Sequence, residues 1–487
     1  MSGAADSRLA AGCLLGSFVG TQAPPWLLGA VRDGLGGVLL FAQNVVDDVQ
    51  VTELCAQLRN ARADVVIAID EEGGDVTRLD AARGSDTPCP AAFGFVDDLR
   101  LTADAYAGLG ERVRSLGIDL TLAPCSDINS NPRNPIIGVR SFGTTPDGVS
   151  RHVVAAVEGF HNGGVSVCAK HFPGHGDTSA DTHVGPALLT ASMATLVKRE
   201  LVPFAAAIGA GVDSILTAHV VADAVDDAPV SVSQFWSEHL RAMGFDRAII
   251  TDALDMDAVA EGRGIAGVAD AAVRALGAGA DFLCLGSNFD ESMTSMVVDR
   301  VAAAIEDGQL DRIELERSLD RIALLRRSPS SPSPPTTFDP TAALHVAEKA
   351  IVVDGQLPAG PFAVLECRPP GSMACFNVSW GIADALGERG WSTASITASD
   401  PIAAACTTLL EAAGEMPILV VVRDACVHIW QTAVIDALVD ARPQSVVVVE
   451  LGWPSTRPAG SAAFVVSHGA ARSSAQAVID RLVSKEP

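Results

Sequence analysis

The chain has 487 residues, of which 48% are hydrophobic and 19% are charged, and its formal net charge is −25. A chain of this length usually exceeds one hydrophobic core, so we expect two domains or three. This net negative charge argues against nucleic acid and anionic membranes as partners, and its spread along the sequence indicates a solvated surface. No apolar stretch is long enough to span a membrane as a helix.

The ten cysteines show no Cys-x-x-Cys pair and no regular spacing. Cys168 and Cys284 lie inside apolar runs that resemble strands, which fits reduced and buried thiols better than a disulfide framework. The N-terminal residues lack a basic segment followed by a long apolar run. We therefore expect a cytoplasmic protein.

Short apolar runs alternate with amphipathic helical patterns through the first part of the chain. The runs predict eight strands, at 14–19, 37–41, 65–69, 119–123, 165–169, 214–218, 248–251 and 281–285. Helical patterns lie between them, at 100–115, 150–162, 194–210 and 266–278 among others. Eight such β-α units are typical of a (β/α)8 or TIM-like barrel, which usually takes about 250 residues.

A Pro/Ser-rich tract at 327–340 is the clearest linker in the sequence. Beyond it the alternation resumes, with strands at 362–366, 418–422, 445–450 and 463–467 and helices at 378–389, 402–413, 427–440 and 471–484. We expect an α/β protein: a (β/α)8 catalytic domain at 1–326, then a smaller α/β sandwich domain at 341–487 with a mostly parallel sheet. His428 and His468 are isolated in that second domain and suggest no catalytic site there.

The segment 168–183 carries the densest group of ionisable residues, namely three histidines, two aspartates and one lysine. Pro173, Gly174 and Gly176 bend it directly after a predicted buried strand. Ionisable groups held on a bent loop at a strand end are costly to position, and they usually serve chemistry. For His175 and Asp177 we expect hydrogen bonds inside the loop.

Other polar residues follow other predicted strands. They are Asp70 after the third, Arg140 in the long loop 124–149 after the fourth, Lys170 and His171 after the fifth, His219 after the sixth, Asp252 after the seventh, and Gly286 and Ser287 after the eighth. Barrel enzymes build their active sites at the carboxyl ends of the strands. We therefore expect these residues to converge on one rim.

Several of these residues lie in motifs that resemble glycoside hydrolase family 3, specifically its bacterial β-N-acetylglucosaminidases. Lys-His-Phe-Pro-Gly-His-Gly at 170–176, followed by Asp-Thr-His at 181–183, is similar to the family's signature. The further blocks match in order, with Ile-Asp-Glu-Glu-Gly-Gly at 69–74 and Arg78, Gly-Val-Arg-Ser-Phe at 138–142, Thr-Ala-His at 217–219 and Thr-Asp-Ala-Leu at 251–254. The likeness covers about 10–325, whereas the C-terminal part resembles the family's second domain only in general character.

The resemblance implies that Asp252 is the nucleophile of a retaining mechanism and forms a covalent glycosyl-enzyme. It assigns acid/base catalysis to His183, paired with Asp181, where most retaining glycosidases use a second carboxylic acid. Asp181 would fix the tautomer of His183 and raise its pKa. The residues alone leave two alternatives open: Asp252 as a helix N-cap, and Asp181 and His183 as a loop pair bonded to backbone.

The resemblance also implies a sugar-binding set, made up of Asp70, Arg78, Arg140, Lys170 and His171, with His219 as a further candidate. Charged side chains of this kind form hydrogen bonds with neighbouring hydroxyl groups of a sugar. No cofactor and no metal is implied. Three positions depart from the family pattern: Glu71 replaces a common Gln, Asp75 a common Arg, and Val139 an acidic residue before the arginine. They leave the leaving-group preference open.

These observations favour an exo-acting retaining β-N-acetylglucosaminidase that releases terminal GlcNAc from cell-wall-derived or small chitin-type glycosides. One alternative is a phosphorylase that yields GlcNAc-1-phosphate, because a histidine acid/base does not repel an incoming phosphate. Two further classes stay open, an inactive sugar-binding protein and a metal-dependent hydrolase. In the latter the zinc ligands would come from His171, His175, Asp177, Asp181 and His183.

Overall fold

The computed structural model describes residues 2–178, 187–326, 340–372, 374–375 and 378–484. The chain forms two compact units. Unit 1 comprises Met1–Glu72, Thr102–Ser130 and Thr144–Asp339, and unit 2 comprises Gly73–Leu101, Asn131–Gly143 and Pro340–Pro487. Segments 73–101 and 131–143 thus fold with the C-terminal residues, although the sequence analysis counts them with the barrel domain. The expected linker lies almost entirely outside the described residues.

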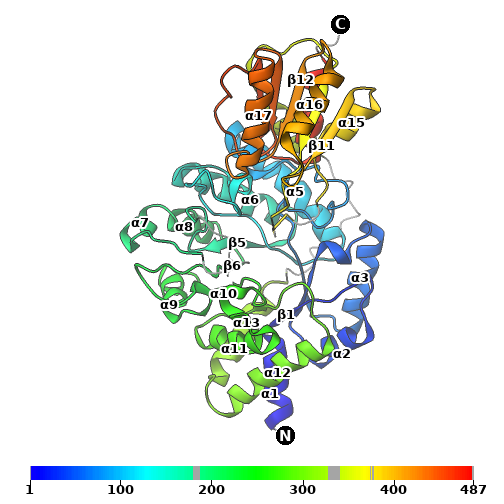
Figure 1. The fold of residues 1–487 in the computed structure, drawn as a ribbon. Coiled ribbons are helices and arrows are strands. Elements are labelled where there is room, and N and C mark those ends of the chain that lie inside the picture. Colours follow the sequence, from blue (N-terminus) through cyan, green and yellow to red (C-terminus); the bar gives the residue numbers. More distant parts are fainter. Residues whose placement is uncertain (1, 179–186, 327–339, 373, 376–377, 485–487) are drawn as a thin grey trace. The chain divides into compact units, whose positions relative to one another are not determined.

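Unit 1 is a barrel of parallel strands surrounded by helices (Figure 1). Its strands are β1 (Leu14–Gly16), β2 (Gly37–Leu40), β3 (Val66–Ile69), β4 (Leu120–Thr121), β5 (Ser166–Phe172), β6 (Ser214–Thr217), β7 (Ala248–Thr251) and β8 (Leu283–Cys284). They pair in the order β7-β6-β5-β4-β3-β2-β1-β8, and a bridge between Ile250 and Phe282 joins the two ends. The structure confirms the predicted barrel and each of its strands.

Every residue of these strands is buried, because side chains fill the barrel on one face and helices cover the other. The interior cluster includes Leu39, Leu120 and Phe282. The surrounding helices are α1 (Ser2–Gly12), α2 (Pro25–Asp33), α3 (Asp48–Ala61), α5 (Leu99–Ser115), α6 (Pro146–Asn162), α7 (Met193–Lys198), α8 (Leu201–Gly209), α9 (Gln234–Ala242), α10 (Asp257–Ala260), α11 (Gly264–Gly277), α12 (Glu291–Glu306) and α13 (Arg312–Ala323).

The predicted helix at 194–210 is two helices, α7 and α8. Helix α7 ends before Arg199, whose backbone leaves the helical region. Pro203 has no N–H to donate to the Arg199 carbonyl, and it therefore fits only in the first turn of the new helix. The single-helix prediction was wrong because the apolar spacing continues across this break.

Unit 2 contains a sheet with the strand order β11-β10-β12-β13-β14-β9. The strands are β9 (Val352–Gly355), β10 (Ala363–Cys367), β11 (Ser392–Ile396), β12 (Ile418–Val422), β13 (Val446–Glu450) and β14 (Ala463–Val466). All neighbours are parallel except β14 and β9, which confirms the expected mostly parallel sheet. Two edge strands, β9 and β11, were not predicted: β9 has only two apolar residues, both half-buried, and four of the five residues of β11 are exposed.

Helices cover both faces of this sheet, as a sandwich requires. Helices α15 (Ala383–Glu388) and α18 (Arg472–Val483) contribute to one hydrophobic cluster, and α16 (Ile402–Ala413) and α17 (Ile429–Ala441) contribute to the other. The unit also contains α4 (Pro90–Val96) and α14 (Thr341–Lys349).

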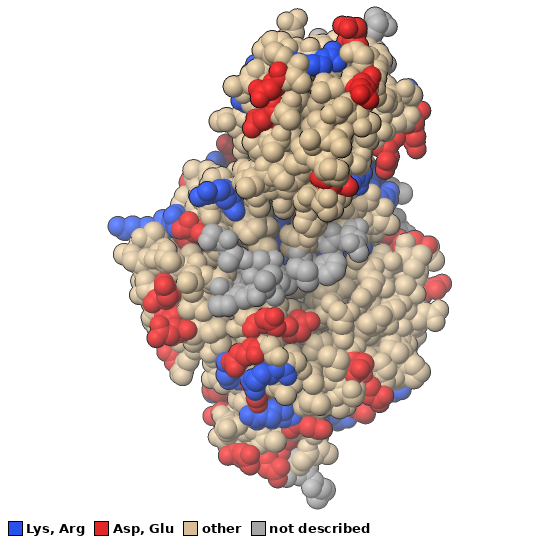
Figure 2. Space-filling model, in the orientation of Figure 1, with Lys and Arg blue, Asp and Glu red and all other residues tan. Residues whose placement is uncertain are grey.

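Acidic side chains are scattered over the face shown in Figure 2, and no single patch collects them. Within the described residues, no helix combines the length and the apolar character needed to cross a membrane.

Candidate active site

The structure places five of the predicted site residues at the carboxyl ends of strands in unit 1. Asp70 follows β3, His219 lies two residues beyond β6, and Asp252 follows β7 directly. Lys170 and His171 were expected after the strand but lie within it, because β5 continues to Phe172, which pairs with Thr217 of β6. Since parallel strands end on the same side of a barrel, these side chains share one rim.

Lys170 joins two carboxylates on this rim. Its Nζ lies 2.5 Å from Asp70 Oδ1 and 2.5 Å from Glu72 Oε1, and the lysine is only 3% exposed. A buried ammonium group is tolerated when carboxylates pair with it, so this arrangement fixes both Lys170 and Asp70. Glu72 was not among the predicted residues.

Asp127 is the centre of a second hydrogen-bond cluster, just beyond β4. Its Oδ2 accepts hydrogen bonds from the His171 N–H (3.1 Å), from His171 Nδ1 (2.6 Å) and from Cys125 Sγ (3.2 Å), and its Oδ1 accepts one from the His175 N–H (2.6 Å). Burial opposes ionisation here, but attraction by His171 and the hydrogen bonds outweigh it and lower the pKa of Asp127 to about 2. The Asp127 carboxylate therefore fixes the orientation of the His171 ring through Nδ1.

Asp127 was not among the predicted residues either. Its histidine partners lie 44 and 48 positions away in the chain, so spacing gives no sign of them. The available signal was its place in a loop directly after a predicted strand, the position that marks Asp70 and Asp252.

Hydrogen bonds and ion pairs hold the loop after β5 at several positions. His175 Nδ1 bonds Thr178 Oγ1 at 2.8 Å, as expected for a bond inside the loop. Burial and repulsion by His171 lower the pKa of His175 to about 4. Asp177 instead pairs with Arg199, outside the loop. Beneath the loop, Glu200 bonds Arg199 at 2.5 Å and lies against Gly174, where a Cβ would come within 2.9 Å of its Oε2.

Asp252 is half-buried at the end of β7. Its Oδ1 accepts a hydrogen bond from the Ala253 N–H at 2.9 Å, and its own N–H donates to the Thr217 carbonyl at 3.0 Å. The N-cap alternative is wrong, because the next helix, α10, begins at Asp257 with Met256 as its N-cap. Burial, followed by the charges of Asp252 and Asp70 among other groups, raises the pKa of the Cys284 thiol, so both carboxylates act on the same buried neighbour.

His219 supports the residue that follows Asp252. Its Nε2 bonds the Ala253 carbonyl at 2.9 Å, and its Nδ1 bonds Ser231 Oγ at 2.6 Å. A carbonyl oxygen only accepts, so Nε2 carries the proton, and in the neutral ring Nδ1 accepts from the serine hydroxyl. With both ring nitrogens used within the protein, His219 orients the Asp252–Ala253 turn.

The end of β8 needs a glycine. Gly286 has φ +105°, and a Cβ there would lie 2.0 Å from the carboxylate of Asp255. Asp255 itself is exposed.

Four predicted site residues remain. Arg78 and Arg140 belong to unit 2, where Arg78 Nη1 donates to the Ala374 carbonyl at 3.0 Å and Arg140 Nη1 to the Ile136 carbonyl at 3.2 Å. Their convergence with the rim stays a prediction. Asp181 and His183 lie outside the described residues, so their catalytic roles also stay predictions.

A model of the glycosyl hydrolase family 3 N-terminal domain matches residues 30–325. The chain belongs to glycosyl hydrolase family 3. This result confirms the resemblance drawn from the motifs at 69–74, 138–142, 170–176 and 251–254.

Curated proteins named as β-hexosaminidases resemble this chain in sequence. β-Hexosaminidase A of Pseudoalteromonas piscicida is 32% identical over 336 residues, an alignment that covers 63% of this chain and 56% of that relative. The β-hexosaminidase of Xylella fastidiosa (strain M23) is 36% identical over 274 residues, covering 55% of this chain and 79% of the relative. The chain therefore spans little more than half the length of the first relative.

Solved structures share its fold. A β-N-acetylglucosaminidase from Paenibacillus sp. str. FPU-7 gives a TM-score of 0.85 at 28% identity, over 99% of this chain and 97% of that one. NagZ from Neisseria gonorrhoeae, solved in complex with N-trifluoroacetyl-D-glucosamine, gives 0.54 at 25% identity, over 65% of this chain and 98% of that one. The first comparison covers the barrel and the second α/β domain alike.

In this family 3 chain, the zinc alternative gains no support from the residues proposed for it. Among the described residues, the group with metal-ligand chemistry is Cys125, Asp127 and His171, and their polar atoms bond one another. His175 is bonded to Thr178, and Asp177 is paired with an arginine. The described part of the proposed ligand set therefore forms separate contacts rather than one coordination centre.

Proposed function

We propose that this family 3 protein is a retaining exo-β-N-acetylglucosaminidase that releases terminal GlcNAc from small chitin-type or cell-wall-derived glycosides. The observation that carries the proposal is the position of Asp252, a half-buried carboxylate at the tip of β7 on the rim that also holds Asp70, Lys170 and His171. The similarity to named β-hexosaminidases and to a β-N-acetylglucosaminidase supports the substrate class.

The reaction proceeds in two steps. A carboxylate oxygen of Asp252 attacks the anomeric carbon, the bond to the leaving oxygen breaks, and protonated His183 gives that oxygen its proton. Neutral His183 then takes a proton from water, whose oxygen attacks the anomeric carbon and releases Asp252. Two displacements at one carbon restore the β configuration.

The other rim residues hold the sugar. Asp70 accepts from ring hydroxyls, and Lys170, fixed between two carboxylates, donates to them. His171 is held at Nδ1 by Asp127 and bonds the sugar through Nε2, its second polar atom. Each of these groups is fixed before substrate binds, so little ordering entropy is lost on binding.

The test is to trap the covalent intermediate with a slow fluorinated glycosyl substrate and to map the labelled peptide. We expect the label on Asp252. The matched control is Asp255→Asn, which removes an exposed carboxylate three residues away and should leave the labelling unchanged. A label on any other residue, or none in a protein that still turns over, would refute the assignment.

A second measurement concerns the acceptor. Products are compared with and without millimolar phosphate, and we expect free GlcNAc at an unchanged rate in both. Formation of GlcNAc-1-phosphate would show instead that the protein is a phosphorylase. The cytoplasmic location belongs to this proposal as well, and it rests on the sequence.

A further inference from the structure

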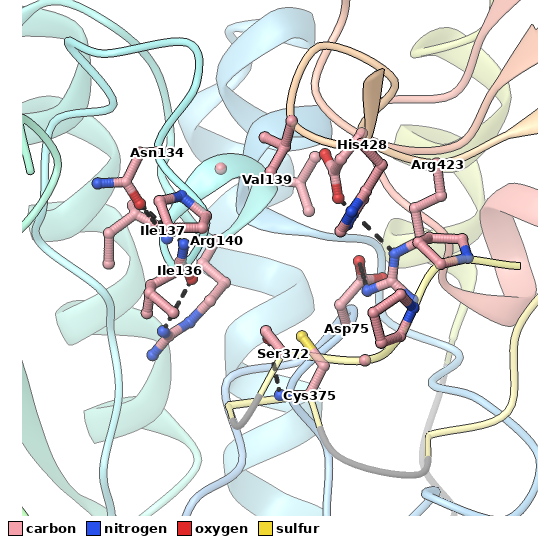
Figure 3. A pocket seen from close by; sticks show the side chains of 17 residues that line it. Asp75, Asn134, Ile136, Ile137, Val139, Arg140, Ser372, Cys375, Arg423 and His428 are labelled. Carbon is pink, nitrogen blue, oxygen red and sulfur yellow. Dashed lines mark hydrogen bonds and ion pairs between the residues drawn. The ribbon is translucent and has the colours of Figure 1, made fainter. Parts of the chain in front are cut away.

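Unit 2 contains a pocket at the carboxyl edge of its parallel sheet (Figure 3). All of its lining residues belong to this unit. One wall is the loop after β10, residues 369–372, and another is the turn after β12, which carries Arg423, Asp424 and His428. Asp75 and the segment 134–140 complete the lining.

The pocket lies where the order of the strands reverses. From β10 the chain continues to β11 on one side of it, and then crosses to β12 on the other side. Loops that leave two such strands diverge, and open α/β sheets bind their ligands in the crevice between them. The loops after β10 and β12 are the ones that line this pocket.

Buried polar groups hold the turn after β12 in one conformation. The Gln431 side chain accepts from the Arg423 N–H at 3.0 Å and donates to the Arg423 carbonyl at 2.7 Å. Glu450, at the end of β13, accepts from the N–H groups of Asp424 at 2.8 Å and Gly452 at 2.7 Å. Asp424 has φ +54°, a left-handed conformation that costs a non-glycine residue energy. These hydrogen bonds hold the backbone of the turn rigid, so the side chains of Arg423 and Asp424 are kept in fixed positions.

The turn presents both hydrogen-bond donors and acceptors. Arg423 packs its guanidinium 5.2 Å from the ring centre of Trp380 and bonds Asp75 through Nη2 at 2.7 Å. Within the described part of the chain, its Nη1 donates to no residue. Burial lowers the pKa of His428, which keeps the imidazole neutral and able both to donate and to accept.

The charges indicate an uncharged ligand. Two guanidinium groups, of Arg140 and Arg423, face two carboxylates, of Asp75 and Asp424, so the lining attracts neither phosphate nor an ammonium group by net charge. Hydroxyl groups, which donate and accept at once, suit such a mixture. Pro369, Pro370 and Val427 add apolar surface for a C–H face.

We propose that this pocket is a saccharide-binding site in which Arg423, Asp424 and His428 bond ring hydroxyls. Arg140, which the family resemblance assigns to sugar binding, lines the same pocket. Nothing in the family comparison assigns a role to the other three residues, since the matched domain ends at residue 325. The choice of GlcNAc as the probe sugar rests on the proposed function.

The test is equilibrium dialysis of N,N′-diacetylchitobiose against the full-length Asp252→Ala protein and against the same protein with His428→Ala and Asp424→Asn added. We expect the added changes to remove one bound sugar per chain, or to weaken its binding by about tenfold or more, as the loss of one or two hydrogen bonds implies. The matched control is His345→Ala, which changes an exposed histidine on α14 of the same unit. It should bind as the parent does.

Equal binding by the parent and the altered pocket would overturn the proposal, and so would saturable binding of inorganic phosphate that the pocket substitutions abolish. If the double substitution unfolds the protein, His428→Ala alone serves, because the described residues give its ring no hydrogen bond to lose. Turnover of an aryl β-GlcNAc by the unaltered protein tests the proposed function separately. A protein without turnover that still loses one bound sugar on pocket substitution would keep this site and refute the activity.

Discussion

Asp127 Oδ2 and His171 Nδ1 lie 2.6 Å apart, and this bond joins the loop after β4 to the last residues of β5. The same carboxylate accepts the backbone N–H groups of His171 and His175. One buried charge thus fixes the ring orientation of a predicted sugar-binding residue and the start of the loop that leads toward His183. Asp127 is in this sense a positioning residue.

The variant Asp127→Asn tests that role. Its amide NH2 would face a donor where the carboxylate now accepts, so we expect His171 to shift and kcat/KM to fall by about 100-fold, the scale that a displacement of about 1 Å costs. Loss of sugar contacts predicts that a raised KM accounts for part of the fall. Steady-state kinetics on an aryl β-GlcNAc measures both parameters.

The barrel offers a matched control at the other end of β5. Asp213 is also buried, and its Oδ2 bonds the ring of His161 at 2.8 Å and the Val167 N–H at 3.1 Å. We expect Asp127→Asn and Asp213→Asn each to lower the free energy of unfolding by about 1–3 kcal/mol. Asp213→Asn should leave kcat/KM close to the parent value, because residues at this end of a barrel serve stability. Equal kinetic losses in the two variants would mean that Asp127 acts only through stability.

Asp252→Ala removes the proposed nucleophile. We expect kcat to fall by about 10⁴-fold or more, since no other group would form the covalent intermediate. The comparison is Asp255→Asn, which alters an exposed carboxylate in the same loop and should retain turnover. Substantial activity in Asp252→Ala with an unchanged thermal midpoint would show that another residue attacks the sugar.

His183→Ala separates acid catalysis from sugar binding. An activated aryl leaving group departs without a proton, whereas an alkyl or sugar leaving group needs one. We therefore expect a much larger loss of kcat/KM on chitobiose than on a nitrophenyl glycoside. Losses of the same size on both substrates would contradict the acid role of this histidine.

His219 should act through Asp252 and not on substrate directly. His219→Gln keeps an N–H near the position of Nε2 that can reach the Ala253 carbonyl, and His219→Ala does not. We expect the alanine variant to lose kcat with little change in KM, and the glutamine variant to recover part of the loss. A rise in KM common to both variants, with kcat kept, would instead indicate a sugar contact.

The sequence predicted the barrel well because its strands are buried on both faces and read as uninterrupted apolar runs. Their order also placed Asp70, His219 and Asp252 at strand ends. The sequence did not predict which site residues bond to one another. Nothing local ties Asp127 to His171, or Glu72 to Lys170, because a carboxylate in a loop looks the same with or without a partner across the barrel.

The sequence also did not predict contacts between residues far apart in the chain. The bond between Asp75 and Arg423 joins residues 348 positions apart, and it is one of the contacts that place 73–101 in unit 2. At the sequence level Asp75 is only a departure from a family pattern. Its partner lies in a segment where the family resemblance is general, so no motif points to it.

Glu200 gives the loop after β5 a measurable pH dependence of stability. Burial, only partly offset by Arg199, raises its pKa from 4.5 to about 7. Between these values the folded protein holds a proton that the unfolded chain has released, so stability is full below about pH 4.5 and is lost as the pH rises through 7. The loss amounts to about 3 kcal/mol over that window.

The variant Glu200→Gln does not titrate. Its free energy of unfolding, measured by chemical denaturation, should therefore rise relative to that of the parent between pH 4.5 and pH 7. The exposed Glu158→Gln on α6 should show a constant difference, and the same constant difference for Glu200→Gln would show that this carboxyl ionises normally in the folded protein.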